Sequence, residues 1–143
     1  MEFDLKRSFT YRMHLLHKDT DYESQNVYKQ SLGLSLSETR SLSVLGLNAK
    51  TSVMQLADLA NLNKSQASRA AQVLIDKGLA IKHENPDDGR GIELKLTAVG
   101  ERLWKKTMTL IEKRNQQILS CLTVKERETL NQLIDKLLTH TVK

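Results

Sequence analysis

The stretch LNKSQASRAAQVLIDKGL, residues 62–79, carries the strongest structural signal in this sequence. Asn63 suits the N-cap of a helix, and Gly78 suits the left-handed turn that follows a helix. At about 100° per residue the small apolar residues fall on one face of that helix: Ala67, Ala70, Ala71 and Leu74. The opposite face has no acid and no large apolar residue until the helix is nearly finished; it consists of Lys64, Ser65, Ser68, Arg69 and Gln72.

Short hydroxyl and amide side chains beside Lys and Arg are what reading base edges next to phosphates requires. The polar face, with Gln66 beside it, therefore predicts a helix that reads DNA. An ordinary solvent-exposed face of an amphipathic helix shows the same pattern. The neighbouring segments are therefore needed to distinguish a DNA-reading face from a merely solvated one.

The segment before this helix predicts a second helix joined to it by a short turn. Ser52 and Gln55 have the spacing of a capping box, in which each side chain bonds the other's backbone amide. Asn61 can adopt the left-handed geometry that ends a helix, and Leu62 is expected to point inward. Two helices connected so closely, the second with a polar reading face, predict a helix-turn-helix.

After Gly78 the apolar period changes to that of strands. Residues 79–84 and 92–96 are predicted to pair as a hairpin, with Leu79 and Ile81 facing inward. Residues 85–91, NPDDGRG, form a dense cluster of turn residues at the tip of that hairpin. A helix-turn-helix followed by such a hairpin predicts a winged helix with a two-stranded wing.

The N-terminal third predicts a helix over residues 3–17 with one apolar stripe made of Phe9, Met13 and Leu16. A polar run from residue 18 to 35 predicts a break near 18–24, with a further turn through Val27 and Tyr28. Ser37 is then expected to cap a short helix that ends near Gly46 and Asn48.

The C-terminal third predicts two further helices. Thr97 is expected to cap the first, which carries Leu103, Trp104 and Met108 on its apolar side, and Thr123 with Glu126 forms a second capping box. The last helix has an unbroken apolar stripe of Leu130, Leu133, Ile134, Leu137 and Leu138. These stripes exceed what a winged core can cover, so either the first helix or a second subunit is expected to cover them.

Composition limits the classes of protein. The chain has 143 residues and a net charge of +5, which favours acidic partners. One cysteine, Cys121, excludes an internal disulfide and fits a reducing compartment. No run approaches the roughly 20 apolar residues of a membrane span, and no signal-peptide core begins the chain, so a cytoplasmic protein is expected. No phosphate loop and no Ser/His/Asp signature points to an enzyme, and neither a cofactor nor a metal is expected.

At this point the sequence resembles the MarR family of winged helix-turn-helix transcriptional regulators, from about residue 32 to 122. Residues 85–100, NPDDGRGIELKLTAVG, are similar to the family's wing signature of Asp-x-Arg at the tip and Leu-Thr-x-x-Gly opening the next helix. Asp88 and Arg90 match the tip, and Leu96, Thr97 and Gly100 match the close. Gly89 stands where the family often has another basic residue, and Asn61 replaces the common turn glycine.

The resemblance implies a mainly α (α+β) fold. Residues 32–100 would form the DNA-binding core, and residues 1–31 and 101–143 would form a helical dimerisation region of the same single domain, 1–143. It implies a homodimer on a pseudo-palindromic operator in double-stranded DNA, in which Arg90 enters the minor groove and Asp88 orients it. Such proteins usually act as repressors, and many release DNA when they bind a small phenolic or aromatic molecule. Met13, His17 and Trp104 are the residues expected to line an effector pocket.

Three alternatives remain open at this stage. His14 and His17 have a spacing that can hold a metal, although two ordinary amphipathic histidines are favoured. Cys121 could sense oxidation, although a packed small hydrophobic residue is favoured. A winged helix can also bind another protein without specific DNA binding; that version would show exposed Leu, Phe or Trp where this sequence has Lys64 and Arg69.

Overall fold

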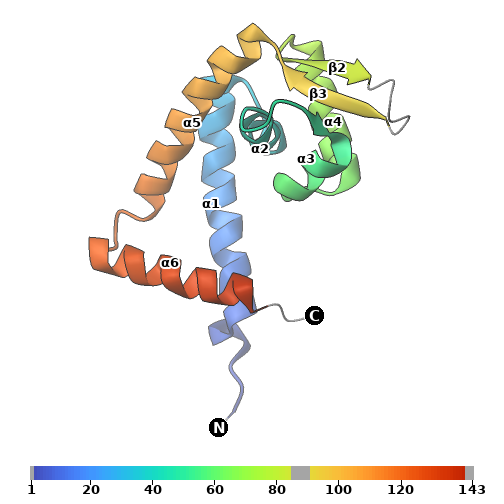
Figure 1. The fold of residues 1–143 in the computed structure, drawn as a ribbon. Helices are drawn as coiled ribbons and strands as arrows, with labels where there is room; N and C mark the ends of the chain where they lie inside the picture. Colours follow the sequence, from blue (N-terminus) through green and yellow to red (C-terminus); the bar gives the residue numbers. More distant parts are fainter. Residues whose placement is uncertain (1, 85–90, 141–143) are drawn as a thin grey trace. The chain divides into compact units, whose positions relative to one another are not determined.

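The computed structural model describes residues 2–84 and 91–140, and the chain divides into two compact units. The first unit is Met1–Thr109 and the second is Leu110–Lys143. The fold is mainly helical with one small antiparallel sheet, as the sequence predicts (Figure 1). Within the described residues no helix is long and apolar enough to cross a membrane.

The first unit begins with a short 3-10 turn, Leu5–Arg7, and one long helix, α1, Phe9–Leu32. The break predicted near residues 18–24 is wrong, because α1 is continuous through them. No Gly or Pro interrupts residues 1–32, and the polar residues lie along the helix rather than ending it. Asp21 accepts a hydrogen bond from the Arg40 guanidinium at 3.1 Å and pairs with His17 at 3.1 Å.

The second helix, α2, Leu36–Leu45, begins two residues earlier than predicted. Its N-cap is Ser35 rather than Ser37, because Ser35 and Glu38 form a capping box with bonds of 3.2 Å in both directions. Ser37 has Arg40 at the corresponding position, which cannot accept the return bond. Gly46 follows the last residue of α2, in agreement with the prediction.

The predicted helix-turn-helix is confirmed. Helix α3, Val53–Leu59, begins with the expected Ser52–Gln55 capping box, and α4, Lys64–Asp76, begins with a third such box. Asn61 has a φ of 55°, the left-handed geometry that the sequence predicts for it. The Leu62 amide donates to the Ala57 carbonyl at 2.9 Å, which closes the end of α3 and turns the chain into α4.

The sheet has three strands in the order β1–β3–β2: β1 is Thr51–Ser52, β2 is Ala80–Glu84 and β3 is Ile92–Leu96. The hairpin of β2 and β3 is the predicted wing, whereas β1 was not predicted, because two residues are too few to show a strand pattern. Ile81 lies opposite Lys95 and is exposed, so its predicted inward orientation is wrong. The register places Ala80 on the buried face instead, opposite Leu96.

One hydrophobic cluster lies at the centre of the first unit and joins α2, α3, α4 and the sheet. Its members with no exposed surface include Leu34, Leu42, Leu56, Ala67 and Leu74. Helix α5, Ala98–Ile118, begins against this core. The Thr97 hydroxyl accepts from the Gly100 amide at 3.0 Å, which confirms the predicted cap of α5.

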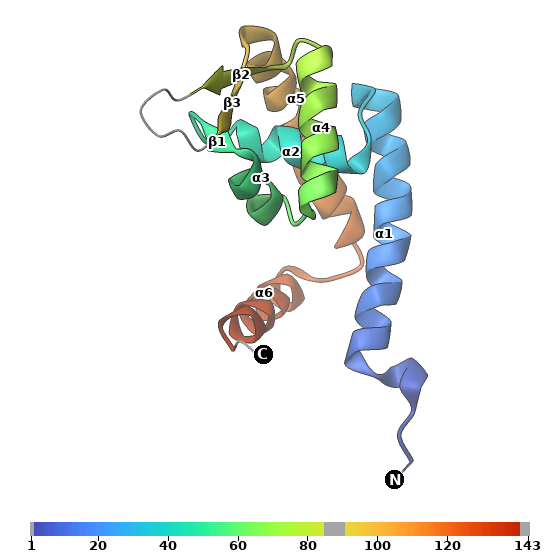
Figure 2. The same ribbon diagram turned by 90° about the vertical axis from the view of Figure 1, so that its right-hand side faces the viewer.

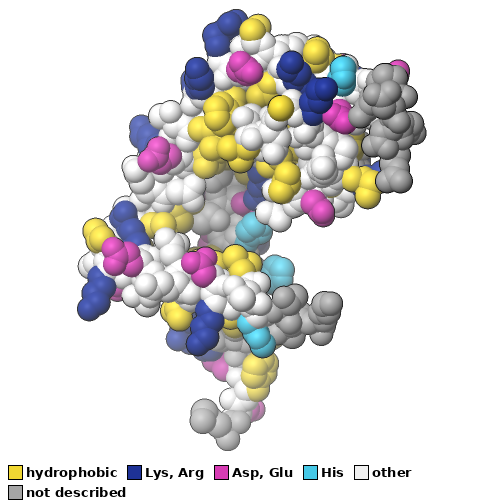
Figure 3. All heavy atoms as spheres, viewed as in Figure 1, with side chains coloured by type: hydrophobic (Ala, Val, Ile, Leu, Met, Phe, Trp, Pro, Cys, Tyr) yellow, Lys and Arg dark blue, Asp and Glu magenta, His cyan; other side chains and the backbone are white. Residues whose placement is uncertain are grey.

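The second unit contains the end of α5 and the helix α6, Val124–Thr139. The capping box of Thr123 and Glu126 is present as predicted. No residue of α6 is buried, and hydrophobic side chains are visible at its surface among charged ones (Figure 3). Cys121, in the turn before α6, is exposed, so the expectation that it packs as a small hydrophobic residue is wrong.

Candidate nucleic-acid interface

The buried face of α4 is made of small side chains that bring the helix close to its support. Ala67, Ala70, Ala71 and Leu74 are the buried residues of α4, which are the four that the periodicity predicts. Their burial leaves the other side of the helix facing solvent, so the predicted reading face is fully presented on the surface of the first unit.

The exposed face of α4 holds four side chains with uncommitted polar groups. Lys64, Ser65, Ser68 and Arg69 are exposed. In the part of the chain that the structure describes, no large hydrophobic side chain of α4 is exposed beside them. Two cations and two hydroxyls in the first two turns can donate to phosphate oxygens and to base edges.

Two other predicted reading residues are already engaged within the helix. Gln66 is half-buried: its side-chain Oε1 accepts from the Asn63 backbone amide at 3.0 Å, and its backbone amide donates to Asn63 Oδ1 at 2.8 Å. The Gln72 Nε2 group donates to the Asp76 carboxylate at 2.8 Å. Each bond restricts the orientation in which the side-chain amide could meet a base.

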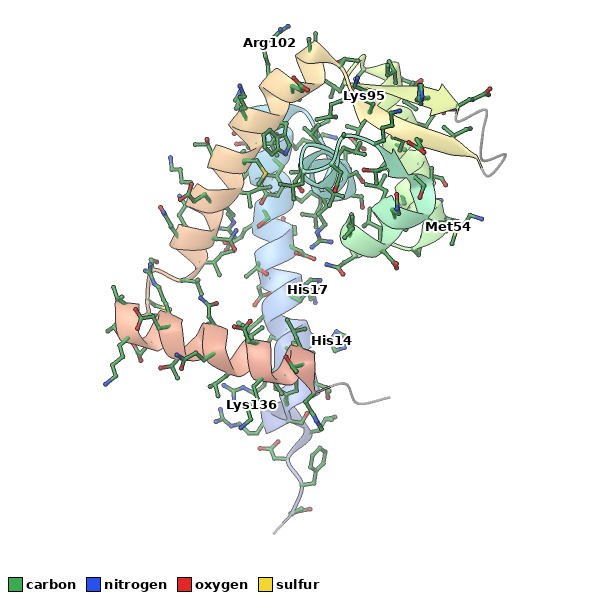
Figure 4. The ribbon with its side chains drawn as sticks, in the orientation of Figure 1. His14, His17, Met54, Lys95, Arg102 and Lys136 are labelled. Carbon is green, nitrogen blue, oxygen red and sulfur yellow. The ribbon has the colours of Figure 1, made fainter. Side chains whose placement is uncertain are left out.

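The wing carries exposed cations that the sequence reasoning did not single out. Lys82 in β2 and Lys95 in β3 are exposed, and Lys95 projects from the sheet in Figure 4. The alternation Glu93-Leu94-Lys95-Leu96 already indicates that Lys95 points outward, which is the signal that could have found it. The predicted wing-tip residues Asp88 and Arg90 lie outside the described residues.

The residues predicted to line an effector pocket are not all together. Met13 and His17 line one hollow of about 440 Å³ on α1, together with His14, Leu16 and Thr20. Both histidines project from the N-terminal half of α1 (Figure 4). Trp104 lies elsewhere: its indole N–H donates to the Ser43 carbonyl at 3.1 Å, and its ring packs so closely on Gly46 that a Cβ there would lie 2.0 Å away.

The metal hypothesis at His14 and His17 finds no further ligand. Among residues 2–84 and 91–140, no three His, Cys, Asp or Glu side chains gather as a metal site would require. His17 pairs instead with Asp21, whose other oxygen accepts from Arg40, so this part of α1 is tied to α2.

The chain is similar in sequence and in fold to known proteins. The sequence model of the MarR family matches residues 32–91, which contain α2, the helix-turn-helix and the start of the wing. A MarR/EmrR family transcriptional regulator from Acinetobacter sp. ADP1 is similar over 96% of both chains, with 26% identity and a TM-score of 0.85.

Two more distant solved structures share the fold. A MarR variant from E. coli in complex with operator DNA is 24% identical, covers 95% of this chain and 99% of its own, and has a TM-score of 0.81. A MarR-family regulator from Silicibacter pomeroyi is 21% identical over 100% of this chain and 99% of its own, with a TM-score of 0.79.

The family is one of transcriptional regulators rather than enzymes, which confirms the prediction that this chain is no enzyme. The match over residues 32–91 and the fold shared over nearly the full length therefore make this chain similar to the MarR family of transcriptional regulators.

Proposed function

We propose that this chain binds double-stranded DNA sequence-specifically, as a homodimer on a pseudo-palindromic operator, and represses transcription until a small molecule releases it. The observation that carries the DNA-binding part is the exposed face of α4, where Lys64, Ser65, Ser68 and Arg69 stand without an acid among them. The solved E. coli relative in complex with operator DNA shares this fold, which supports the same use here.

The opposing candidate is a winged helix that binds another protein. Such an interface would place large apolar side chains at its centre. In the described part of the chain, the large hydrophobic residues of α4 are not exposed. The side chains that are exposed in its first two turns carry hydroxyl, ammonium and guanidinium groups. The chemistry of this face therefore favours a polyanion over an apolar partner surface.

Support for a homodimer comes from apolar surface that each unit leaves exposed. On α6, Leu133 is 55% exposed and Leu137 is 52% exposed, four residues apart on one stripe. On α1, Phe9, Met13 and Leu16 are exposed as well. An exposed apolar stripe of this kind marks an interface, and a two-fold dimer uses the same surface of both subunits.

Support for effector release is the hollow on α1. Its apolar wall contains Met13 and Leu16, while His14, His17 and Thr20 supply polar groups at its edge. A pocket with an apolar wall and a few polar groups suits a small organic ligand, and the aromatic or phenolic molecules predicted from the resemblance have that character. Met13 and His17 are the residues proposed to contact it.

The test is a binding titration on a duplex selected from a random pool and on a scrambled duplex of equal length. Arg69→Ala should weaken binding to the selected duplex by about 1–3 kcal/mol, or roughly 5- to 150-fold, and weaken the scrambled duplex much less. Arg102→Ala is the matched control, because it removes an equal charge from an exposed position on α5 (Figure 4). Affinity for either duplex should fall steeply with salt, as phosphate contacts require.

Two results would decide against parts of the proposal. An equal loss on both duplexes for Arg69→Ala would mean that this face contacts only phosphates, so that any specificity comes from DNA shape. Binding that is absent or indifferent to salt would favour the protein-binding candidate.

A further inference from the structure

The C-terminal end of α1 holds two lysine ammonium groups from different helices. Lys77, at the end of α4, donates to the Gly33 carbonyl at 2.7 Å, and Lys106 of α5 donates to the Ser31 carbonyl at 3.0 Å. Gly33 has a φ of 69° and ends α1, so these carbonyls have no partner further along the helix. Ammonium groups at this position also face the negative end of the helix dipole.

The same end of α4 is bonded to α5 as well. The Thr97 hydroxyl donates to the Gly78 carbonyl at 2.7 Å, and the Thr97 amide donates to the Leu79 carbonyl at 3.0 Å. Gly100 packs directly on Leu79, where a Cβ would lie 1.9 Å from the carbonyl oxygen. The C-terminal end of α4 is thus bonded to the end of α1 and to the start of α5. Figure 2 shows α2, which packs on both α1 and α4, crossing behind α4 toward α1.

The proposed reading residues lie at the other end of the helix. Helix α4 has 13 residues, and at about 1.5 Å per residue its two ends are about 18 Å apart. A tilt of about 5° at the C-terminal end would move the N-terminal end by about 1.6 Å, which exceeds the tolerance of a hydrogen bond to a base. The positions of the reading residues therefore depend on what holds the C-terminal end of α4.

We propose that Lys77 is a positioning residue that sets the orientation of α4, and with it the sequence preference, by bonding the Gly33 carbonyl at the end of α1. This inference rests on the proposed DNA-binding function. Helix α1 is a firm support for such a bond, because the Asp21–Arg40 pair at 3.1 Å ties it to α2. Lys77 itself need not touch DNA.

The test compares Lys77→Met with Lys106→Met. Both replace one ammonium group by an apolar side chain of similar length at the same end of α1, but Lys106 belongs to α5. Lys77→Met should lower affinity for the selected duplex five- to tenfold and leave the scrambled duplex within twofold, with an unchanged salt slope. Lys106→Met should leave the ratio of the two affinities unchanged, and Lys77→Arg, which can still donate to the carbonyl, should restore it.

A second measurement separates this inference from DNA binding itself. Residual dipolar couplings of the amides of α4 and α1, measured in the DNA-free protein, should report a changed orientation of α4 in Lys77→Met and none in Lys106→Met. If no duplex is preferred but the couplings change, the proposed function fails and the positioning role stands. Unchanged couplings, or an equal loss of affinity on both duplexes for Lys77→Met, would overturn the positioning role.

Discussion

Helices α4 and α6 have similar amphipathic patterns, but only the apolar side of α4 is buried. In α4 the apolar stripe is covered by its own chain, and Ala67 and Leu74 have no exposed surface. In α6 the stripe remains at the surface of its unit, and Leu138 is 76% exposed. Each helix begins with a capping box of the same form.

The difference shows that periodicity predicts a helix and its apolar side but not what covers that side. Small residues in α4 allow it to pack closely against α2 and α3, which precede it in the same unit. Leucines in α6 project further and need a surface that the unit Leu110–Lys143 does not contain. Three experiments test the contrast between α4 and α6.

The largest effect is expected where the stripe of α6 is exposed. Leu133→Asp combined with Leu137→Asp should convert the proposed dimer to a monomer, because assembly would bury two charges without partners. Light scattering at micromolar concentration measures the change in mass. The matched control is Gln132→Asp with Thr139→Asp, which adds the same charges to the opposite, polar face of α6. A wild-type protein that is already a folded monomer would contradict the interpretation.

An intermediate effect is expected on the apolar stripe of α4, which is buried. Ala67→Leu should lower the free energy of unfolding by about 1–3 kcal/mol, because the added carbons meet a core that has no space for them. Denaturant unfolding monitored by circular dichroism measures the loss. Ser68→Leu at the adjacent exposed position should change stability by no more than about 0.5 kcal/mol. Equal losses for the two variants would mean that α4 is not packed as described.

The smallest effect concerns the capping boxes of α4 and α6. In α6 the Thr123 amide, and secondarily the Thr123 side chain, hold the pKa of Glu126 below its ordinary value of 4.5. In α4 the equivalent residue is the uncharged Gln66. Because the folded pKa is lowered, the contribution of Glu126 is present above the unfolded pKa and is lost as pH falls through the folded pKa.

An NMR titration of the Thr123 amide should therefore show a midpoint below pH 4.5, and Glu126→Gln should remove it. The Asn63 amide of α4 is the internal control, since its partner carries no titrating group. A Thr123 midpoint at or above 4.5 would contradict the bond to the charged carboxylate.

The sequence alone determined most of the features that depend on contacts within about one helical turn, with the N-cap of α2 as the exception. The capping boxes at Ser52 and Thr123, the N-cap Asn63, the left-handed Asn61 and the apolar side of α4 all follow from residue type and spacing, and the structure confirms each. Each is decided by a bond or a rotation that involves residues three or four positions apart, so a single segment contains the whole cause.

Only the tertiary structure decided the features that depend on distant partners. Helix α1 runs through its polar segment, where Arg40, 19 residues away, pairs with Asp21. Strand β1 forms because Thr51 and Ser52 meet β3, and Ile81 faces outward because the register with Lys95 places it there. The Lys77 bond to Gly33 spans 44 residues. No local pattern encodes such pairings, because they depend on where the folded core brings each backbone group.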